Sequence, residues 1–274
     1  MDNHPLMDLL VNPWTLAAKV FWINTACFAA WYFLPGAIIW FRHFRQGLSQ
    51  PSRRKVFVDA LKPGQLRREL IYSVLTLLII GTGWLSAWYL YWIGANQIYE
   101  SVDAMPLAWI PVSAVITLVL FDAWFYWTHL AMHHPKLFRF FHVTHHQSRI
   151  TTPFTGYALD PAEAATYAVF LPLVTMVLPL HPLAVSIFMA LNIATNLVIH
   201  SGHEIFPAKF AHSRWGWLFS SATSHAMHHR LARGNYGFCF QYWDRLMGTC
   251  SPGYDDLLKQ TTARRHWLPG GHTP

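Results

Sequence analysis

Residues 107–134 read LAWIPVSAVITLVLFDAWFYWTHLAMHH, a long apolar run that ends in a group of histidines. A helix needs about 20 mainly apolar residues to cross the hydrocarbon core of a bilayer. Residues 107–127 supply that length with a single acidic side chain, Asp122. The stretch therefore predicts a membrane-spanning helix that brings histidines to one end of a helical bundle.

Four further apolar runs lie at about 14–40, 70–93, 162–180 and 183–199. Pro35 and Gly36 predict a kink or an end in the first run, and Leu180-His181-Pro182 predicts a turn between the last two. Five such runs in 274 residues favour membrane helices over the buried helices of a soluble domain. The fold class we expect is all-α and integral to a membrane, with four to five transmembrane helices and a cytosolic helical cap carrying a histidine-rich two-metal site.

The composition agrees with a membrane protein and excludes several other classes. Hydrophobic residues make up 53% of the chain and charged residues 12%, about half of the roughly 25% charge of a soluble domain. This excludes a disordered chain and a collagen, and three cysteines give no disulfide framework or zinc motif. The net charge of +7 requires no nucleic acid, because basic residues beside membrane helices meet anionic lipid headgroups.

The charge distribution predicts an orientation. Segment 42–69 carries eight Lys and Arg residues against Asp59 and Glu69, whereas segment 94–106 carries two acids and no Lys or Arg. The positive-inside rule places 42–69 in the cytoplasm. Counting helices from there predicts a multi-pass protein of a bacterial inner membrane or the endoplasmic reticulum, with both histidine-rich segments on the cytoplasmic side.

Twelve of the 17 histidines fall in two segments, 129–146 and 200–229. Spacings of three and four residues place imidazoles on one helical face, as metal ligands require. The predicted ligands are His129, His133, His142, His145, His146, His200, His225, His228 and His229. A structural zinc site closes with four ligands, so nine histidines fit two ions better than one.

Three further polar residues stand near the predicted ligands. Asn196 lies one helical turn before His200 and is a candidate catalytic residue, acting on a metal directly or through a water. His203 is a candidate for an added ligand or a polar contact in the substrate cavity. His134 is a doubtful ligand, because it turns away from the face that His129 and His133 share.

Carboxylates are expected beside the ligands, since metal-binding imidazoles usually donate their second N–H to an acceptor. Asp122 precedes His129 by seven residues on the same helical face, and it is the first candidate. Glu163, Glu204 and Asp244 are weaker candidates, for which a helix cap or a surface salt bridge is the alternative.

The three histidine boxes resemble those of the fatty acid hydroxylase superfamily, also called the sterol desaturase family. Its pattern of two histidines four apart, then two His-x-x-His-His boxes, is met by His129/His133 and by the boxes that start at His142 and His225. The stretch from His200-Ser-Gly to Pro207 resembles one found in sterol-oxidising members, which usually have Tyr where this chain has His203. That departure weakens a transfer of sterol specificity. The resemblance covers about 115–250.

The resemblance implies a di-iron enzyme that uses O2 and two electrons to hydroxylate or desaturate an unactivated C–H bond of a lipid from the bilayer. It implies a separate electron donor, a ferredoxin or b-type cytochrome served by an NAD(P)H reductase. Zinc is expected to bind in purified samples, because the affinity order favours it over ferrous iron. The expected domains are 1–110 (membrane helices and basic loop), 111–250 (catalytic) and 251–274 (tail).

Two other functions fit a histidine-rich membrane protein. A non-enzymatic metal-binding or metal-transport protein would need ligands along a path across the membrane, whereas these cluster at helix ends. A haem protein would need isolated axial histidines on facing helices, and the tight triplets argue against it. The substrate class stays open among sterols, other polycyclic lipids, fatty acyl chains and carotenoids.

Overall fold

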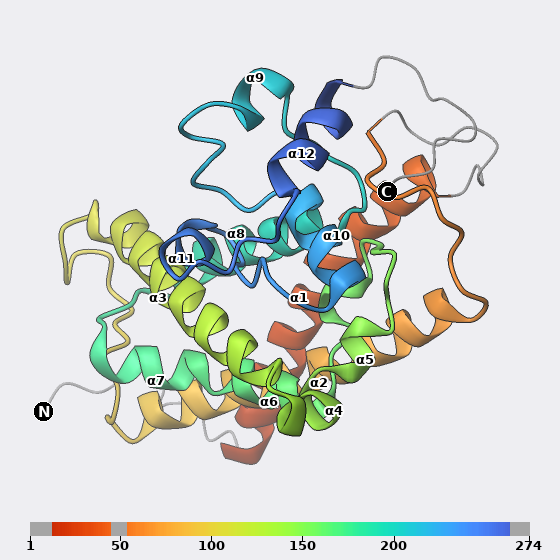
Figure 1. Ribbon diagram of the computed structural model, residues 1–274. Helices are drawn as coiled ribbons and strands as arrows, with labels where there is room; N and C mark the ends of the chain where they lie inside the picture. The colour runs from red at the N-terminus through yellow and green to blue at the C-terminus, as the bar shows by residue number, and fades with distance from the viewer. Residues whose placement is uncertain (1–12, 45–53, 264–274) are drawn as a thin grey trace, which may run out of the picture.

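The computed structural model describes residues 13–44 and 54–263, and over these ranges it is helical apart from loops and isolated β-bridges (Figure 1). Its longest helices are α1 (Pro13–His43), α2 (Gln65–Trp92), α3 (Trp109–Met132) and α8 (Pro182–His200). These four are long and apolar enough to cross a membrane. The predicted all-α fold with four to five such helices is confirmed, at four in the described part of the chain.

The run predicted over 162–180 is helical but does not form one membrane-spanning helix. The chain instead forms two short helices, α6 (Pro161–Ala168) and α7 (Phe170–Val177), which meet at Val169. Pro172 explains the break, because proline lacks an N–H and its ring clashes with the carbonyl four residues earlier, at Ala168. Neither half reaches the length that a membrane crossing needs.

We expected Pro35 to kink α1 or to end it. The helix does not end there, and it continues to His43 with Pro35 inside it. Membrane helices tolerate proline where neighbouring helices surround it. Here Gly36 faces such a neighbour, since a Cβ on it would lie 3.1 Å from the Phe154 ring and 3.6 Å from Leu197. Packing against neighbouring segments therefore allows α1 to remain helical through Pro35 and Gly36.

Two apolar cores hold the bundle together. One joins α3, α7 and α8 through aromatic rings that include Phe121, Phe170 and Phe188. The other joins α1 and α2 to η2 (Thr155–Tyr157) and α8. Large apolar side chains also face outward, such as Leu34 and Ile38 on α1, at 66% and 65% exposure. Outward apolar faces are expected where lipid surrounds a helix.

Short helices gather where α3 and α8 end. They are α4 (Pro135–Phe141), α5 (Val143–His146), α9 (Ala208–Ala211), α10 (Ala222–Leu231), α11 (Tyr242–Leu246) and α12 (Tyr254–Ala263). The basic segment reaches the same end of the bundle, where Val56 N–H donates to Gly202 at 3.0 Å and Glu204 N–H donates to Arg54 at 2.8 Å. Part of that segment, with Arg45 and Arg53, lies outside the described residues.

Glu69 fixes the start of α2 to the loop that follows the second histidine box. Its fully buried carboxylate accepts from the hydroxyls of Ser148 (2.7 Å), Thr152 (2.6 Å) and Thr155 (2.9 Å), and from Gln65 Nε2 (2.8 Å). A buried carboxylate is stable only with such partners. The sequence showed Glu69 only as a charge opposing the basic segment, and its structural role was missed.

Gly83 generates a prediction about how α2 packs against α6. A Cβ at this position would collide with the backbone carbonyl of Ala168, which cannot rotate away. Gly83→Ala should therefore destabilise the protein by about 1–3 kcal/mol, as overpacking does. The measurement is thermal or SDS-induced unfolding in detergent. Thr82→Ala, on the exposed neighbouring position, is the control, and equal stability of both variants would contradict this packing.

Candidate metal centre

The structure brings all nine predicted ligands together in two clusters. Cluster 1 contains His129, His133, His142, His146 and His228, and cluster 2 contains His145, His200, His225 and His229. Within each cluster the candidate ligand atoms lie within 4.8 Å of one another. All nine side chains are buried except that of His133, which is half-buried.

Four elements deliver these imidazoles. Helices α3 and α8 contribute their C-terminal turns, and α5 and α10 contribute the two His-x-x-His-His boxes. The start of α10 is fixed twice, because Ser221 Oγ accepts from Ser224 N–H at 3.0 Å and Glu204 Oε2 accepts from Thr223 N–H at 3.1 Å. A carboxylate at a helix N-terminus also favours the helix dipole. In α5 and α10, neighbouring histidines such as His145 and His146 point into different clusters.

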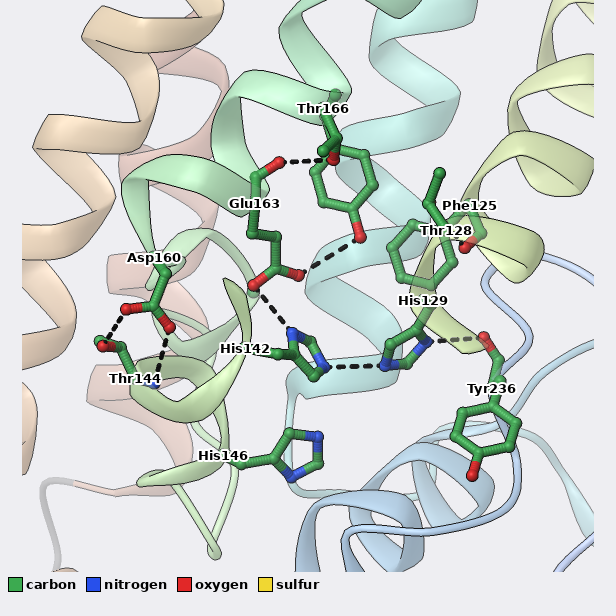
Figure 2. A network of polar contacts seen from close by, with 12 residues as sticks. Phe125, Thr128, His129, His142, Thr144, His146, Asp160, Glu163, Thr166 and Tyr236 are labelled. Carbon is green, nitrogen blue, oxygen red and sulfur yellow. Dashed lines mark hydrogen bonds and ion pairs between the residues drawn. The ribbon is translucent and has the colours of Figure 1, made fainter. Parts of the chain in front are cut away.

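Hydrogen bonds at Nδ1 set the direction of the rings in cluster 1. His129 Nδ1 lies 2.9 Å from the carbonyl oxygen of Tyr236, and His142 Nδ1 lies 2.8 Å from Glu163 Oε2 (Figure 2). Burial raises the pKa of Glu163 well above its usual value; where a bound cation keeps Glu163 ionised, both Nδ1 atoms carry the proton and donate it. The two Nε2 atoms are then lone pairs that face each other at 2.9 Å with no proton between them. Such a contact is repulsive unless a cation lies beside it.

Two further rings, His228 and His200, are also oriented through Nδ1, and each faces a ring, His146 or His225, whose own Nδ1 has no hydrogen-bond partner. His228 Nδ1 donates to the Gly234 carbonyl at 2.6 Å, and its Nε2 faces His146 Nε2 at 3.0 Å. In cluster 2, His200 Nδ1 donates to the Asn196 carbonyl at 2.9 Å, and its Nε2 faces His225 Nε2 at 2.8 Å. Acceptors outside the clusters thus turn Nε2 lone pairs toward both cluster interiors.

The donor sets fit metal ions. Imidazole nitrogens bind zinc at about 2.0–2.1 Å, so neighbouring donors on one ion lie about 3 Å apart, as the facing Nε2 pairs do. Burial lowers the pKa of the box histidines well below its usual value, and that of His133 to about 4. Metals bind the neutral ring. Imidazole sets of this kind suit zinc, copper, iron and nickel.

Glu163, not Asp122, makes the carboxylate–imidazole contact. Asp122 Oδ1 accepts from the backbone N–H groups of Cys239 (2.7 Å) and Phe240 (3.0 Å), which ties α3 to the loop before α11. Glu163 lies in α6 and reaches His142 across the fold. Among the described residues, Asp122 therefore does not orient a ligand ring, as we expected, but holds the loop before α11 against α3.

Asp244 acts on the site through the backbone. Its carboxylate accepts from Tyr236 N–H at 2.8 Å, Gly237 N–H at 2.7 Å and Thr249 Oγ1 at 2.6 Å. These bonds hold the loop whose carbonyls receive the protons of His129 and His228. The sequence could not show that main-chain carbonyls orient ligands.

The remaining candidates lie outside both clusters. His203 packs its ring 4.3 Å from that of His43, and its Nδ1 lies 3.1 Å from the Ser201 carbonyl. His134 caps α4, where its Nδ1 accepts from Lys136 N–H at 3.3 Å. Asn196 Nδ2 donates to the Gly156 carbonyl at 3.2 Å, and its own carbonyl orients His200.

A narrow apolar cavity runs from the helices to cluster 2. His145 and His200 stand at its metal end, and Glu163 also lines it. Aromatic side chains form much of the wall: Phe28, Trp84, Phe121, Phe125 and Phe238. Fold and site together define a helical membrane protein with two histidine clusters able to hold metal at the end of an apolar cavity.

Comparison with known proteins shows which family has a similar sequence. Residues 114–249, about half of the chain, match the model of the fatty acid hydroxylase family. Similar proteins include the lathosterol oxidase of Rattus norvegicus, 29% identical over 188 residues (68% of this chain, 61% of the relative). The Delta(7)-sterol 5(6)-desaturase of Leptosphaeria maculans is 31% identical over 171 residues (61% and 45%). The chain belongs to the fatty acid hydroxylase family.

A third relative is a cholesterol 25-hydroxylase-like protein of Danio rerio, 29% identical over 167 residues (60% of this chain, 64% of the relative). The alignments thus span less than two thirds of each of these relatives. No solved structure matches the chain.

The Glu163–His142 contact generates a prediction about metal retention. Glu163→Leu removes the acceptor of the His142 N–H and should weaken metal binding about 10- to 100-fold, as loss of such partners does. Glu163→Gln keeps an acceptor oxygen and should retain metal more nearly as the unaltered protein does. Competition with a chelator, followed by metal analysis, measures both. Equal retention by the Leu variant would remove Glu163 from the metal centre.

Proposed function

We propose that this chain is a membrane-bound non-haem di-iron oxidoreductase that hydroxylates or desaturates an unactivated C–H bond of a lipid. O2 is the oxidant, and a separate donor supplies electrons. The names of the relatives, which include a sterol oxidase, a sterol desaturase and a hydroxylase-like protein, support this reaction class. The histidine clusters support two ions, one in each.

The observation that carries the proposal is the contact between cavity and cluster. A metal-binding or transport protein has no need of an apolar cavity walled by aromatic rings, whereas a lipid oxidase must bring a carbon of a hydrocarbon chain or ring to the metal. Here that cavity meets His145 and His200. Ligand cavities of this kind, apolar with a few convergent polar groups, are the usual form of small-molecule sites.

Different residues would bind the metals, orient the ligand rings and position the substrate. Bound iron would supply O2 activation. Cluster 1 and cluster 2 hold the ions, and Glu163 with the carbonyls of Tyr236, Gly234 and Asn196 fixes the ring directions. The aromatic wall excludes water and positions the apolar substrate next to cluster 2. A dry site also protects a reactive oxidant from side reactions.

The sidedness belongs to the same proposal. The basic segment and both clusters lie at one end of the bundle, and the positive-inside rule assigns that end to the cytoplasm. A ferredoxin or b-type cytochrome with its NAD(P)H reductase would then deliver electrons from the cytoplasm. The lipid would enter from the bilayer between the helices.

Lipid mass spectrometry tests the reaction. Cells that express the chain should contain a lipid that has gained one oxygen or lost two hydrogens relative to cells that express His145→Ala. The change is expected because His145 stands both in cluster 2 and at the cavity. Identical lipid profiles, together with metal flux into vesicles that contain the protein, would favour metal transport instead.

Ligand substitutions test the site. His145→Ala and His228→Ala should each abolish turnover and lower the metal content, because each removes a donor from one of the clusters. His212→Ala is the matched control, since His212 lies outside both clusters and contacts Thr262. Turnover and bound metal are measured on the same preparations. Normal turnover in either cluster variant would refute the ligand assignment.

A further inference from the structure

One face of α8 carries a polar pair along the cavity. Phe188, Asn192, Asn196 and His200 follow one another at intervals of four residues, and all four line the cavity. Four residues of helix rise about 6 Å. The two amides therefore stand about 6 and 12 Å from the level of His200 along the helix, between the metal end and the aromatic end.

Each amide has one atom in a hydrogen bond and one without a partner. Asn192 Oδ1 accepts from the Tyr157 hydroxyl at 3.0 Å, which leaves Asn192 Nδ2 unpartnered. Asn196 Nδ2 donates to the Gly156 carbonyl at 3.2 Å, which leaves Asn196 Oδ1 unpartnered. Both side chains are only 5% exposed. Leaving a buried donor or acceptor unpaired is costly, so each atom needs a partner.

The fold holds these amides in place. A Cβ at residue 156 would collide with Asn196 Oδ1, so the absence of a side chain at Gly156 allows the amide to lie against the backbone. Tyr157, the next residue, holds Asn192 through its hydroxyl. Both supports come from η2, which packs against α8. The pair is therefore a built feature of the cavity wall.

A free donor and a free acceptor one turn apart match a hydroxyl group. Side chains at i and i+4 stand about 5–6 Å apart at Cβ, so one oxygen between them can reach both amides. A hydroxyl donates one hydrogen bond and accepts others. We propose that Asn192 and Asn196 bind the hydroxyl group of a lipid alcohol, with Asn192 Nδ2 as donor and Asn196 Oδ1 as acceptor.

This inference rests on the proposed function and narrows its substrate class. The hydroxyl lies at the amide pair, the carbon to be oxidised lies between that pair and cluster 2, and the apolar remainder of the lipid lies among the aromatic rings. The oxidised carbon is then within roughly 6–12 Å of the hydroxyl oxygen, one to two helical turns. A lipid alcohol oxidised near its oxygen fits this geometry, and one oxidised at the far end of its chain does not.

Paired probes test the binding site without turnover. Binding is measured on the holoprotein in nanodiscs under nitrogen, with radiolabelled lathosterol against its 3-deoxy analogue and hexadecanol against hexadecane. The unaltered protein should bind at least one alcohol about tenfold more tightly than its hydrocarbon partner, since an unmet pair of buried polar atoms is costly. Equal affinity within both pairs would overturn the inference, and this comparison needs no variant.

Substitution of Asn192 then tests whether its side-chain amide causes the preference for the alcohol over the hydrocarbon. Asn192→Leu keeps the branching and the number of side-chain heavy atoms but removes both polar atoms, and it should reduce the preference for the alcohol to within about twofold while hydrocarbon binding is retained. Met189→Leu, another cavity-lining change without a polar atom, should keep the preference. Retention of the full preference in Asn192→Leu would mean that the amide pairs with a structural water only, and would overturn the assignment.

The two proposals fail separately. Absence of lipid turnover together with an alcohol preference that depends on Asn192 would refute the oxidase and leave the hydroxyl site standing. Turnover of a lipid without any alcohol preference would support the oxidase and refute the hydroxyl site. Product mapping adds a further check, because oxidation more than two helical turns from the hydroxyl contradicts the geometry.

Discussion

Hydrogen bonds at Nδ1 orient buried imidazoles so that their Nε2 atoms face one another in pairs, and the end of the bundle depends on this constraint. The directions of the rings follow from acceptors outside the clusters: Glu163 and the carbonyls of Tyr236, Gly234 and Asn196. Each acceptor accepts a hydrogen bond from Nδ1–H and leaves the Nε2 lone pair of that ring free. With metal bound, both Nε2 lone pairs of a facing pair can coordinate; without metal, one ring of each pair must carry its proton on Nε2.

The rest of the fold supports those acceptors. Asp244 holds the Tyr236 loop, Asp122 fastens the following residues to α3, and Glu204 fixes the start of α10. Glu69 ties the loop after the second histidine box to α2. Buried carboxylates are costly unless they are hydrogen-bonded, and each of these four accepts hydrogen bonds that hold a loop or a helix start near the two clusters.

Repeating patterns made much of this structure predictable. Hydropathy identified α1, α2, α3 and α8, because membrane crossing imposes a minimum apolar length. Spacings of three and four residues identified all nine histidines of the two clusters, because a helix places such residues on one face. Both signals are local, and neither depends on how the elements pack.

Contacts between distant segments were harder to predict. Glu163 reaches His142 only because α6 packs beside α5, whereas Asp122 had the better local spacing and serves a loop instead. Carbonyl acceptors carry no side-chain signal at all. Asn192 drew no attention in the sequence because its value depends on lying in the same cavity wall as Asn196. The break between α6 and α7 follows from a proline whose effect was underestimated.

The most direct test of the two-cluster account is the number and position of metal ions in the folded protein. Protein loaded anaerobically with ferrous iron should bind two ions per chain, and anomalous scattering at the iron edge should place one in each cluster, surrounded by imidazole nitrogens. A single ion per chain at saturating iron, or ions bound away from His142 and His225, would contradict the account.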